Sequence, residues 1–559
     1  QYLKTNGSGV LSWGSDSTSV PSDAQYNTVA GTNAGDSFDG TNAVNNTLLG
    51  YNAGTAITTG DENTAVGSHA LDANTTASYN TALGYAALGV NTTGTENTAL
   101  GNRSLDANTT GNYNTAVGQA ALTNATTASN NTAVGDDALT QCTTGASNVA
   151  VGKGALDANT TASYNTAVGL DALSTNTTGA NNTSIGKDAL FANTTAETNT
   201  AVGYSALKLT TTGPNNVAVG AFSLDANTTG AQNTGVGRQA LSGTTTGGYN
   251  TGLGDRALYS NTTASYNNSI GSQSLYTNTT GNSNNALGYQ ALYANTTGSY
   301  NTAVGHEALE ANTTANNNTA VGFYAGKVIT TGARNTALGS DTLKTATTGD
   351  DNTAVGTNAM YYCTTASNNT AVGKSALQAN TTGHSNTAIG KDALNSNTTG
   401  TYNTALGYET LKTITTGGEA VAIGYQALTN ATGGYSVAIG YASQLDTTTG
   451  VNNVSVGHSS MQNMTTGNQN TAIGGNSLNN TTTGSYNHAI GYTAGFKITS
   501  GEYNITIGHE TASEITTGSN NICVGLRAGR SDSPSGDITT GSNNVVLGNN
   551  SIANLYCAD

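Results

Sequence analysis

The chain has 559 residues, of which only 9% are charged and 35% are hydrophobic. Its 32 acidic residues outnumber the 16 basic ones, and the formal net charge of −16 argues against a nucleic-acid partner, because phosphate binding needs clustered Lys and Arg. No apolar run approaches the roughly 18 residues that a bilayer span requires, so we expect a protein that is not embedded in a membrane.

The chain begins with a segment that lacks the repeat found in the rest of the sequence. Residues 1–26 include "QYLKTNGSGVLSWG", from Gln1 to Gly14, which has no apolar stretch of the kind found in a signal peptide. We interpret residues 1–26 as an N-terminal connecting segment, and the nature of any sequence before Gln1 is left open.

Residues 27–549 repeat one phrase every 17 residues. The stretch "NTAVGSHALDANTTASY" (Asn63 to Tyr79) is followed directly by "NTALGYAALGVNTTGTE" (Asn80 to Glu96). Numbered from its Asn as place one, the repeat reads N-T-A-V-G-x-x-A-L-x-x-N-T-T-G-x-x, and about 31 copies can be aligned on the Gly at place five. A period of this length without helical apolar spacing is typical of a solenoid with one coil per copy.

The local pattern favours strands over helices. Places two to four read "TAV", "VAV" or "VAI", which alternates between two faces as a short strand does, while Gly and β-branched residues disfavour a helix. We therefore predict an all-β parallel β-solenoid with two short strands per coil. We expect Val or Leu at place four and Leu at place nine to fill the coil, and Ala at places three and eight to form faces for close approach. In "NTTG" we expect Asn and Gly to take left-handed dihedrals in a turn.

Stacking places equivalent residues above one another at intervals of about 4.8 Å, so the coils would form a rod of roughly 150 Å. Asn at place twelve should form an amide ladder. Asp at place ten never occurs in adjacent coils, as expected if stacked carboxylates repel. Because each coil offers so few apolar side chains, we expect association into a trimer whose Ala-rich faces meet near the axis. The place-ten aspartates are Asp72, Asp106, Asp157 and Asp225.

The cysteines indicate neither a disulfide framework nor a metal site. Cys142 and Cys363 replace the Asn of "NTT", Cys523 replaces a repeat Ala, and Cys557 lies in residues 550–559, which we interpret as a C-terminal tail. No CxxC spacing occurs. We interpret these residues as small-residue substitutions, and the nature of any sequence after Asp559 is left open.

Candidate catalytic and metal-binding residues are few. His306, His458 and His509 all occupy place six, and the last two lie three coils or roughly 14 Å apart, too far to share a metal ion. Carboxylates are adjacent in three places, but all are variable places and no long insertion builds a cleft. We therefore expect no enzyme activity, catalytic residue, cofactor or metal. The adjacent carboxylates are Asp61 with Glu62, Asp136 with Asp137, and Asp350 with Asp351.

Tyrosine recurs at two places of the repeat. Two aromatic ridges could bind sugars or protein, but we favour the interpretation that they cover coil edges. The Thr pair at places thirteen and fourteen is adjacent, which disfavours the flat Thr array of an ice-binding solenoid. The tyrosines are Tyr51, Tyr85, Tyr204, Tyr289, Tyr408, Tyr425, Tyr441 and Tyr492 at place six, and Tyr79, Tyr113, Tyr164, Tyr249, Tyr266, Tyr300 and Tyr402 at place seventeen.

The strand phrase resembles the head repeat of trimeric autotransporter adhesins, whose consensus is NSVAIG. "YSVAIG" (Tyr435 to Gly440), "EAVAIG" (Glu419 to Gly424) and "NNVAVG" (Asn215 to Gly220) carry the resemblance. It implies a left-handed, trimeric parallel β-roll. The family's repeat is commonly about 14 residues, whereas this one has 17, and its heptad stalk and membrane anchor are not found here.

The ends resemble a second family, the tail fibres of bacteriophages, especially marine ones. The phrase from Gln1 to Gly14 looks like their connecting segment, and "NNVVLGNNSIANLYCAD" (Asn543 to Asp559) is similar to the segment before an endosialidase-type chaperone that trimerises such fibres and then cuts itself off. This resemblance implies a homotrimeric shaft in the virion tail that contacts other tail proteins and a host glycan or protein receptor. The alternatives are a bacterial surface adhesin or adhesive filament, and then a glycan-degrading tailspike or an ice-binding solenoid.

Overall fold

A computed structural model of the protein describes residues 2–5, 11–14 and 23–554. Strands β1 (Tyr2–Thr5) and β2 (Leu11–Gly14) form an antiparallel pair in which Leu3 lies opposite Trp13. The rest of residues 1–26, apart from residues 23–26, and the final residues 555–559 with Cys557 lie outside the described residues. The chain divides into two units, residues 1–272 and 273–559, and each is a stack of coils.

In the first unit each coil contributes one three-residue strand that pairs in parallel with the strand of the next coil. The strands are β3 (Thr28–Ala30), β4 (Thr47–Leu49), β5 (Thr64–Val66), β6 (Thr81–Leu83), β7 (Thr98–Leu100), β8 (Thr115–Val117), β9 (Thr132–Val134), β10 (Val149–Val151), β11 (Thr166–Val168), β12 (Thr183–Ile185), β13 (Thr200–Val202), β14 (Val217–Val219), β15 (Thr234–Val236), β16 (Thr251–Leu253) and β17 (Asn268–Ile270).

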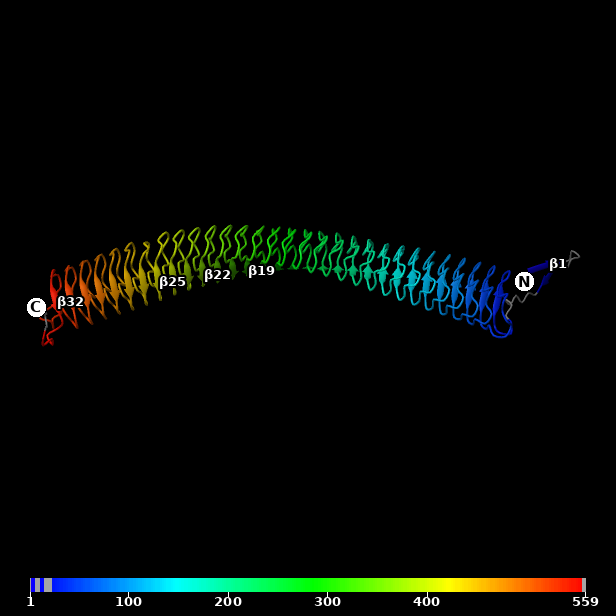
Figure 1. Cartoon of the computed structure of the whole chain (residues 1–559), viewed down its shortest axis with the longest axis horizontal. Coiled ribbons are helices and arrows are strands. Elements are labelled where there is room, and N and C mark those ends of the chain that lie inside the picture. Colours follow the sequence, from blue (N-terminus) through cyan, green and yellow to red (C-terminus); the bar gives the residue numbers. More distant parts are fainter. Residues whose placement is uncertain (1, 6–10, 15–22, 555–559) are drawn as a thin grey trace. The chain divides into compact units, whose positions relative to one another are not determined.

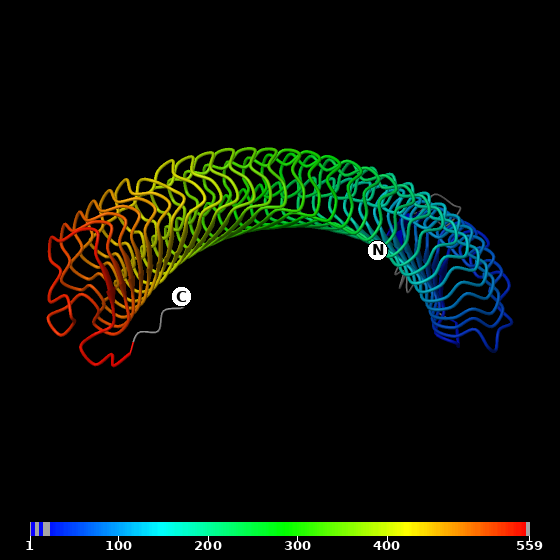
Figure 2. The same ribbon diagram turned by 60° about the vertical axis from the view of Figure 1, so that its left-hand side comes forward.

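The second unit follows the same plan, and its strands lie on the same side of successive coils (Figures 1 and 2). They are β18 (Asn285–Leu287), β19 (Thr302–Val304), β20 (Thr319–Val321), β21 (Thr336–Leu338), β22 (Thr353–Val355), β23 (Thr370–Val372), β24 (Thr387–Ile389), β25 (Thr404–Leu406), β26 (Val421–Ile423), β27 (Val437–Ile439), β28 (Val454–Val456), β29 (Thr471–Ile473), β30 (His488–Ile490), β31 (Ile505–Ile507), β32 (Ile522–Val524) and β33 (Val545–Leu547).

The predicted all-β parallel β-solenoid with a 17-residue repeat is confirmed, and no helix occurs in the described ranges. Equivalent places pair in register, as in Thr64 with Thr81 and Ala65 with Ala82. The irregular copies keep this register too, because Val421 pairs with Val437 across the copy that lacks a residue. Changes in repeat length are therefore absorbed in the turns, and the sheet stays continuous within the unit.

Each coil has one strand, not the two that we predicted. The reason lies in the backbone after place five: His69 and Leu71, at places seven and nine, have φ of 58° and 51°, and the same left-handed values recur in most coils. Left-handed residues interrupt extended backbone. They also correct our expectation for "NTTG", whose Asn and Gly are not the left-handed residues of the coil. Place seventeen is a further left-handed position, as at Tyr79.

The inward and outward residues of the strand are the reverse of those that we predicted. Ala65, at place three, is fully buried, whereas Val66, at place four, points outward and is only half-buried. Leu71 at place nine and Ala70 at place eight complete the apolar interior. The strand period of two forces places three and four onto opposite faces, and the coil is so narrow that only a small residue fits beside the inward Leu.

Two columns of buried Asn run through the stack. The predicted ladder at place twelve is confirmed, because the Asn91 amide nitrogen donates to Asn74 Oδ1 at 2.9 Å. Where the next coil lacks Asn the ladder stops: Asn108 is followed by Ala125, and Asn108 Oδ1 has no partner. A second column at place one was not predicted. There Asn63 Nδ2 donates to Asn46 Oδ1 at 3.1 Å, and the same oxygen accepts from the Asn63 backbone N–H at 2.9 Å.

Glycine at place five allows neighbouring coils to approach closely. Gly67 has φ of 138°, and a Cβ atom on it would lie 2.3 Å from the carbonyl oxygen of Gly84. Only glycine tolerates this dihedral region and this contact together. The Gly that marks the repeat in the sequence therefore permits the coils to stack at the spacing of the parallel strands.

Candidate interaction surfaces

One apolar feature of the surface is a row of aliphatic side chains on the outer face of the sheet. We define the aliphatic stripe as the residues at place four, one Val, Leu or Ile for each coil from β4 to β33. Leu287 is 48% exposed, and most Leu and Ile equivalents in other coils are also exposed, whereas most Val equivalents are half-buried. Place two, mostly Thr, lies on the same face and is also partly exposed. The equivalents above one third exposure in the second unit are Leu338, Ile389, Leu406, Ile473, Ile490, Ile507 and Leu547.

A second exposed feature is a stack of rings at place six of the second unit. We call Tyr408, Tyr425, Tyr441 and His458 the aromatic column. Their successive ring centroids lie 5.2, 5.1 and 4.9 Å apart, with interplanar angles of 12°, 6° and 8°. Because the rings lie face to face, each inner ring covers its neighbours. At the first end Lys391 Nζ lies 5.3 Å from the Tyr408 centroid, a cation–π contact that covers that face.

Some tyrosines at place seventeen stack in pairs. Tyr249 and Tyr266 lie 4.9 Å apart in the first unit, and Tyr486 and Tyr503 lie 4.8 Å apart in the second. Most tyrosines of both predicted rows are exposed, and only some of their rings contact one another. The interpretation that they cover coil edges stays a prediction.

The histidines at place six act as members of these stacks. His458 stacks on Tyr441, and His509 stacks on Tyr492 at 5.4 Å. His306 lies between Tyr289 and Phe323, at 5.2 and 5.4 Å. Within the described ranges no group of three or more His, Cys, Asp or Glu side chains is placed to hold a metal ion. The expectation that the protein binds no metal stays a prediction.

The adjacent carboxylates are bound to their own neighbours. Asp61 Oδ1 accepts from the Val44 N–H at 2.9 Å, and Asp350 Oδ1 accepts from the Ala333 N–H at 2.7 Å. Asp136 pairs with Lys153 at 3.0 Å. These carboxylates hold one coil to the next, and the expectation that the protein has no enzyme activity stays a prediction.

The Thr residues of the "NTT" phrase are also engaged. Thr75 Oγ1 donates to the Thr92 carbonyl of the next coil at 3.2 Å, and the same bond recurs along place thirteen. The adjacent Thr76 is exposed. The place-thirteen hydroxyls therefore contribute to coil stacking.

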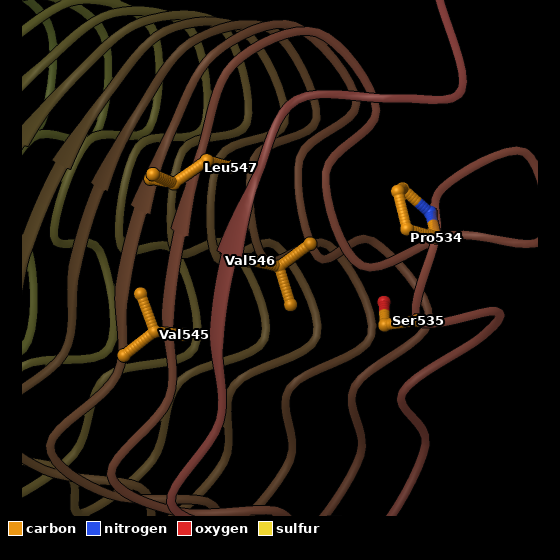
Figure 3. A pocket seen from close by; sticks show the side chains of 5 residues that line it. All are labelled: Pro534, Ser535, Val545, Val546 and Leu547. Carbon is orange, nitrogen blue, oxygen red and sulfur yellow. The ribbon is translucent and has the colours of Figure 1, made fainter. Parts of the chain in front are cut away.

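A cavity of about 500 Å³ lies at the last coil, lined by Pro534, Ser535 and residues 545–547. Figure 3 shows Val546 pointing to the side of Pro534 and Ser535, while Val545 and Leu547 point to the opposite side. Val545 is 69% exposed, but Val546 is nearly buried. The six-residue insertion before the last copy forms one wall of this cavity.

The buried thiols should be unreactive in the folded protein. Burial raises the pKa of Cys142 to about 11 and that of Cys363 to about 12. The thiolate is the reactive form, so neither thiol should be alkylated at neutral pH while the coils are intact. We expect iodoacetamide labelling, followed by peptide mass spectrometry, to find both cysteines unmodified in buffer and modified in denaturant. Rapid labelling of Cys142 in buffer would contradict its placement in the interior.

One place-ten carboxylate should lower stability at neutral pH. Burial raises the pKa of Asp157, and the nearby Asp137 and Asp171 carboxylates raise it further. Because the folded pKa of Asp157 lies above the unfolded one, its contribution to stability is most favourable below the unfolded pKa and is lost as pH rises through the folded pKa. We expect Asp157→Asn to raise the thermal midpoint at pH 7 and to leave it unchanged near pH 3. If Asp157→Asn and the wild type had the same thermal midpoint at pH 7 as well as near pH 3, this prediction would be contradicted.

No model of a known protein family matches the chain, and no curated protein matches it. None of the described residues forms a helix long and apolar enough to span a membrane. The fold and its surfaces define the class: a long parallel β-solenoid repeat protein, built from coils that expose the same residues many times.

Proposed function

We propose that the protein is the shaft of an extracellular attachment fibre, of the kind found in phage tails, and that it assembles as a homotrimer. The observation that carries this proposal is the aliphatic stripe. Monomeric proteins rarely expose contiguous apolar patches larger than a few hundred Å². The stripe has one Val, Leu or Ile in every coil from β4 to β33, and such a continuous row of aliphatic side chains is suited to burial against further copies of the chain.

The stripe also corrects the surface that we assigned to the trimer. The Ala-rich faces that we expected near the axis lie inside the coil, and the residues available for association are those of places two and four. The number of chains, three, and the left-handed winding both come from the resemblance to the adhesin head. Contact through the stripe would give each thin coil the apolar burial that it lacks alone.

The proposed mechanism of attachment is multivalent. Each coil presents similar side chains, and three chains multiply every weak contact with a host glycan or protein. The repeat therefore supplies stiffness and many copies of one surface. An adhesin or adhesive filament on a bacterial surface would use the same mechanism and is the alternative location.

Charged residues in the stripe test the assembly. Leu338 and Leu406 are 46% and 44% exposed. We expect Leu338→Glu together with Leu406→Glu to shift the particle toward single chains of 55.8 kDa in sedimentation. Thr331→Glu, at the exposed place fourteen, is the matched control and should leave the assembly unchanged. A double variant that sediments like the wild type would overturn the stripe as the interface.

The proposed location in the virion tail is tested by determining which particles contain the protein. Peptide mass spectrometry of purified virions and of cell envelopes should find the chain in the virions. Detection only in envelopes would favour the adhesin. Degradation of a host polysaccharide by the purified protein would contradict a purely structural and recognition role.

A further inference from the structure

The outer face of the sheet in the second unit carries one residue that differs in kind from its equivalents. From β19 to β33, place two is Thr, Val or Ile in every strand except β30, where it is His488. None of the other histidines belongs to a strand of the stack, because they lie at places six, seven and sixteen of the repeat. His488 is therefore the one histidine on the face that carries the aliphatic stripe.

The His488 side chain is exposed in a mainly aliphatic surface. Its pairing partners in the adjacent coils are Thr471 and Ile505, and Ile490, at place four of the same strand, is 42% exposed. Within the described ranges no hydrogen bond or ion pair engages the His488 imidazole. Burial of this face against further copies of the chain would take the imidazole out of water, which is costly for a polar group without a partner.

The symmetry of a closed trimer determines what the imidazole meets there. A rotation axis carries no translation, so a residue that faces the axis lies at the same height as its two copies. Place three of each strand points inward, and places two and four point outward, each about 3.3 Å along the strand from the middle of the face. A trimer that buries this face against its axis therefore brings three copies of His488 together beside the axis.

We propose that the three His488 side chains, one from each chain, bind a single divalent transition-metal ion such as Zn²⁺ on the three-fold axis. Imidazole nitrogens are preferred zinc ligands, with bonds of about 2 Å, and three of them leave the fourth tetrahedral position to water. The metal ion gives each imidazole the partner that an aliphatic interface does not provide.

This site rests on the proposed trimer, because one chain supplies only one ligand. It agrees with the finding that no group of three or more ligands occurs within a single chain over the described ranges. It departs from our expectation of no metal, which was drawn mainly from the histidines at place six. Those residues lie outside the strands, whereas His488 lies on the face that the trimer would bury.

Calorimetric titration of the full chain with Zn²⁺, after treatment with EDTA, tests the proposal. We expect one Zn²⁺ ion to bind for every three chains. His488→Thr introduces the commonest residue of place two, so it should keep the fold and the trimer but lose this binding. The matched control is His509→Ala, which removes an exposed histidine at place six of the next coil and should leave the binding unchanged.

Sedimentation of the same samples separates this proposal from the proposed function. A trimer that binds no Zn²⁺, a ratio other than one ion to three chains, or binding retained by His488→Thr would overturn the metal site and leave the trimeric fibre standing. A wild-type protein that sediments as a monomer both with and without Zn²⁺ would overturn the trimer and the metal site together. Co²⁺ in place of Zn²⁺ should give the strong visible absorption of a four-coordinate ion in the wild type and lose it in His488→Thr.

Discussion

Replacing Asn131 by Ala should open the coils around it to solvent. Asn131 lies in the place-one column, where its Nδ2 donates to the Gly145 carbonyl at 2.9 Å and its Oδ1 accepts from the Asn148 N–H at 2.9 Å. The variant leaves both buried partners without these bonds, at a cost of roughly 2–4 kcal/mol. Since stability in a repeat array is local, amide exchange should accelerate about a hundredfold in the coils that contain Asn114, Asn131 and Asn148.

The control for this variant lies in the preceding coil, which begins at Asn114. Thr127, at place fourteen, is exposed, so Thr127→Ala should change local exchange only slightly. Exchange rates that are equal for Asn131→Ala and Thr127→Ala would show that the place-one column contributes little to stacking.

Introducing Leu should destabilise the coil at one place of the strand and be tolerated at the adjacent place. Ala133 is fully buried beside the inward Leu, so Ala133→Leu should destabilise its coil by about 3 kcal/mol through overpacking. Val134 points outward, and Leu already occupies its place in other coils, as at Leu83 and Leu100. Val134→Leu should therefore stay within about 0.5 kcal/mol of the wild type.

Amide hydrogen exchange in the coil around β9 measures the change in stability that each variant causes. If Val134→Leu proved the more damaging of the two, the strand would face the other way, with place four inside as the sequence had suggested to us.

The solenoid was predictable because the residues that define each coil recur at a fixed period in the sequence. The Gly at place five recurs with the coil, and the contact between Gly67 and Gly84 explains why that residue keeps the register. The place-twelve ladder was equally predictable from the regular Asn. The same regularity at place one was an available signal for the second Asn column, and we did not use it.

The direction of the strand was not predictable from side-chain size. A larger residue at place four suggested the interior, but the width of the coil decides which residue fits, and that width depends on the left-handed backbone at residues such as Leu71.

The central claim is that the chain does not exist alone, because its aliphatic stripe is buried against two further copies. Sedimentation equilibrium of the wild-type protein under native conditions tests this most directly. We predict a particle with three times the 55.8 kDa mass of one chain. A stable 55.8 kDa monomer would contradict the account.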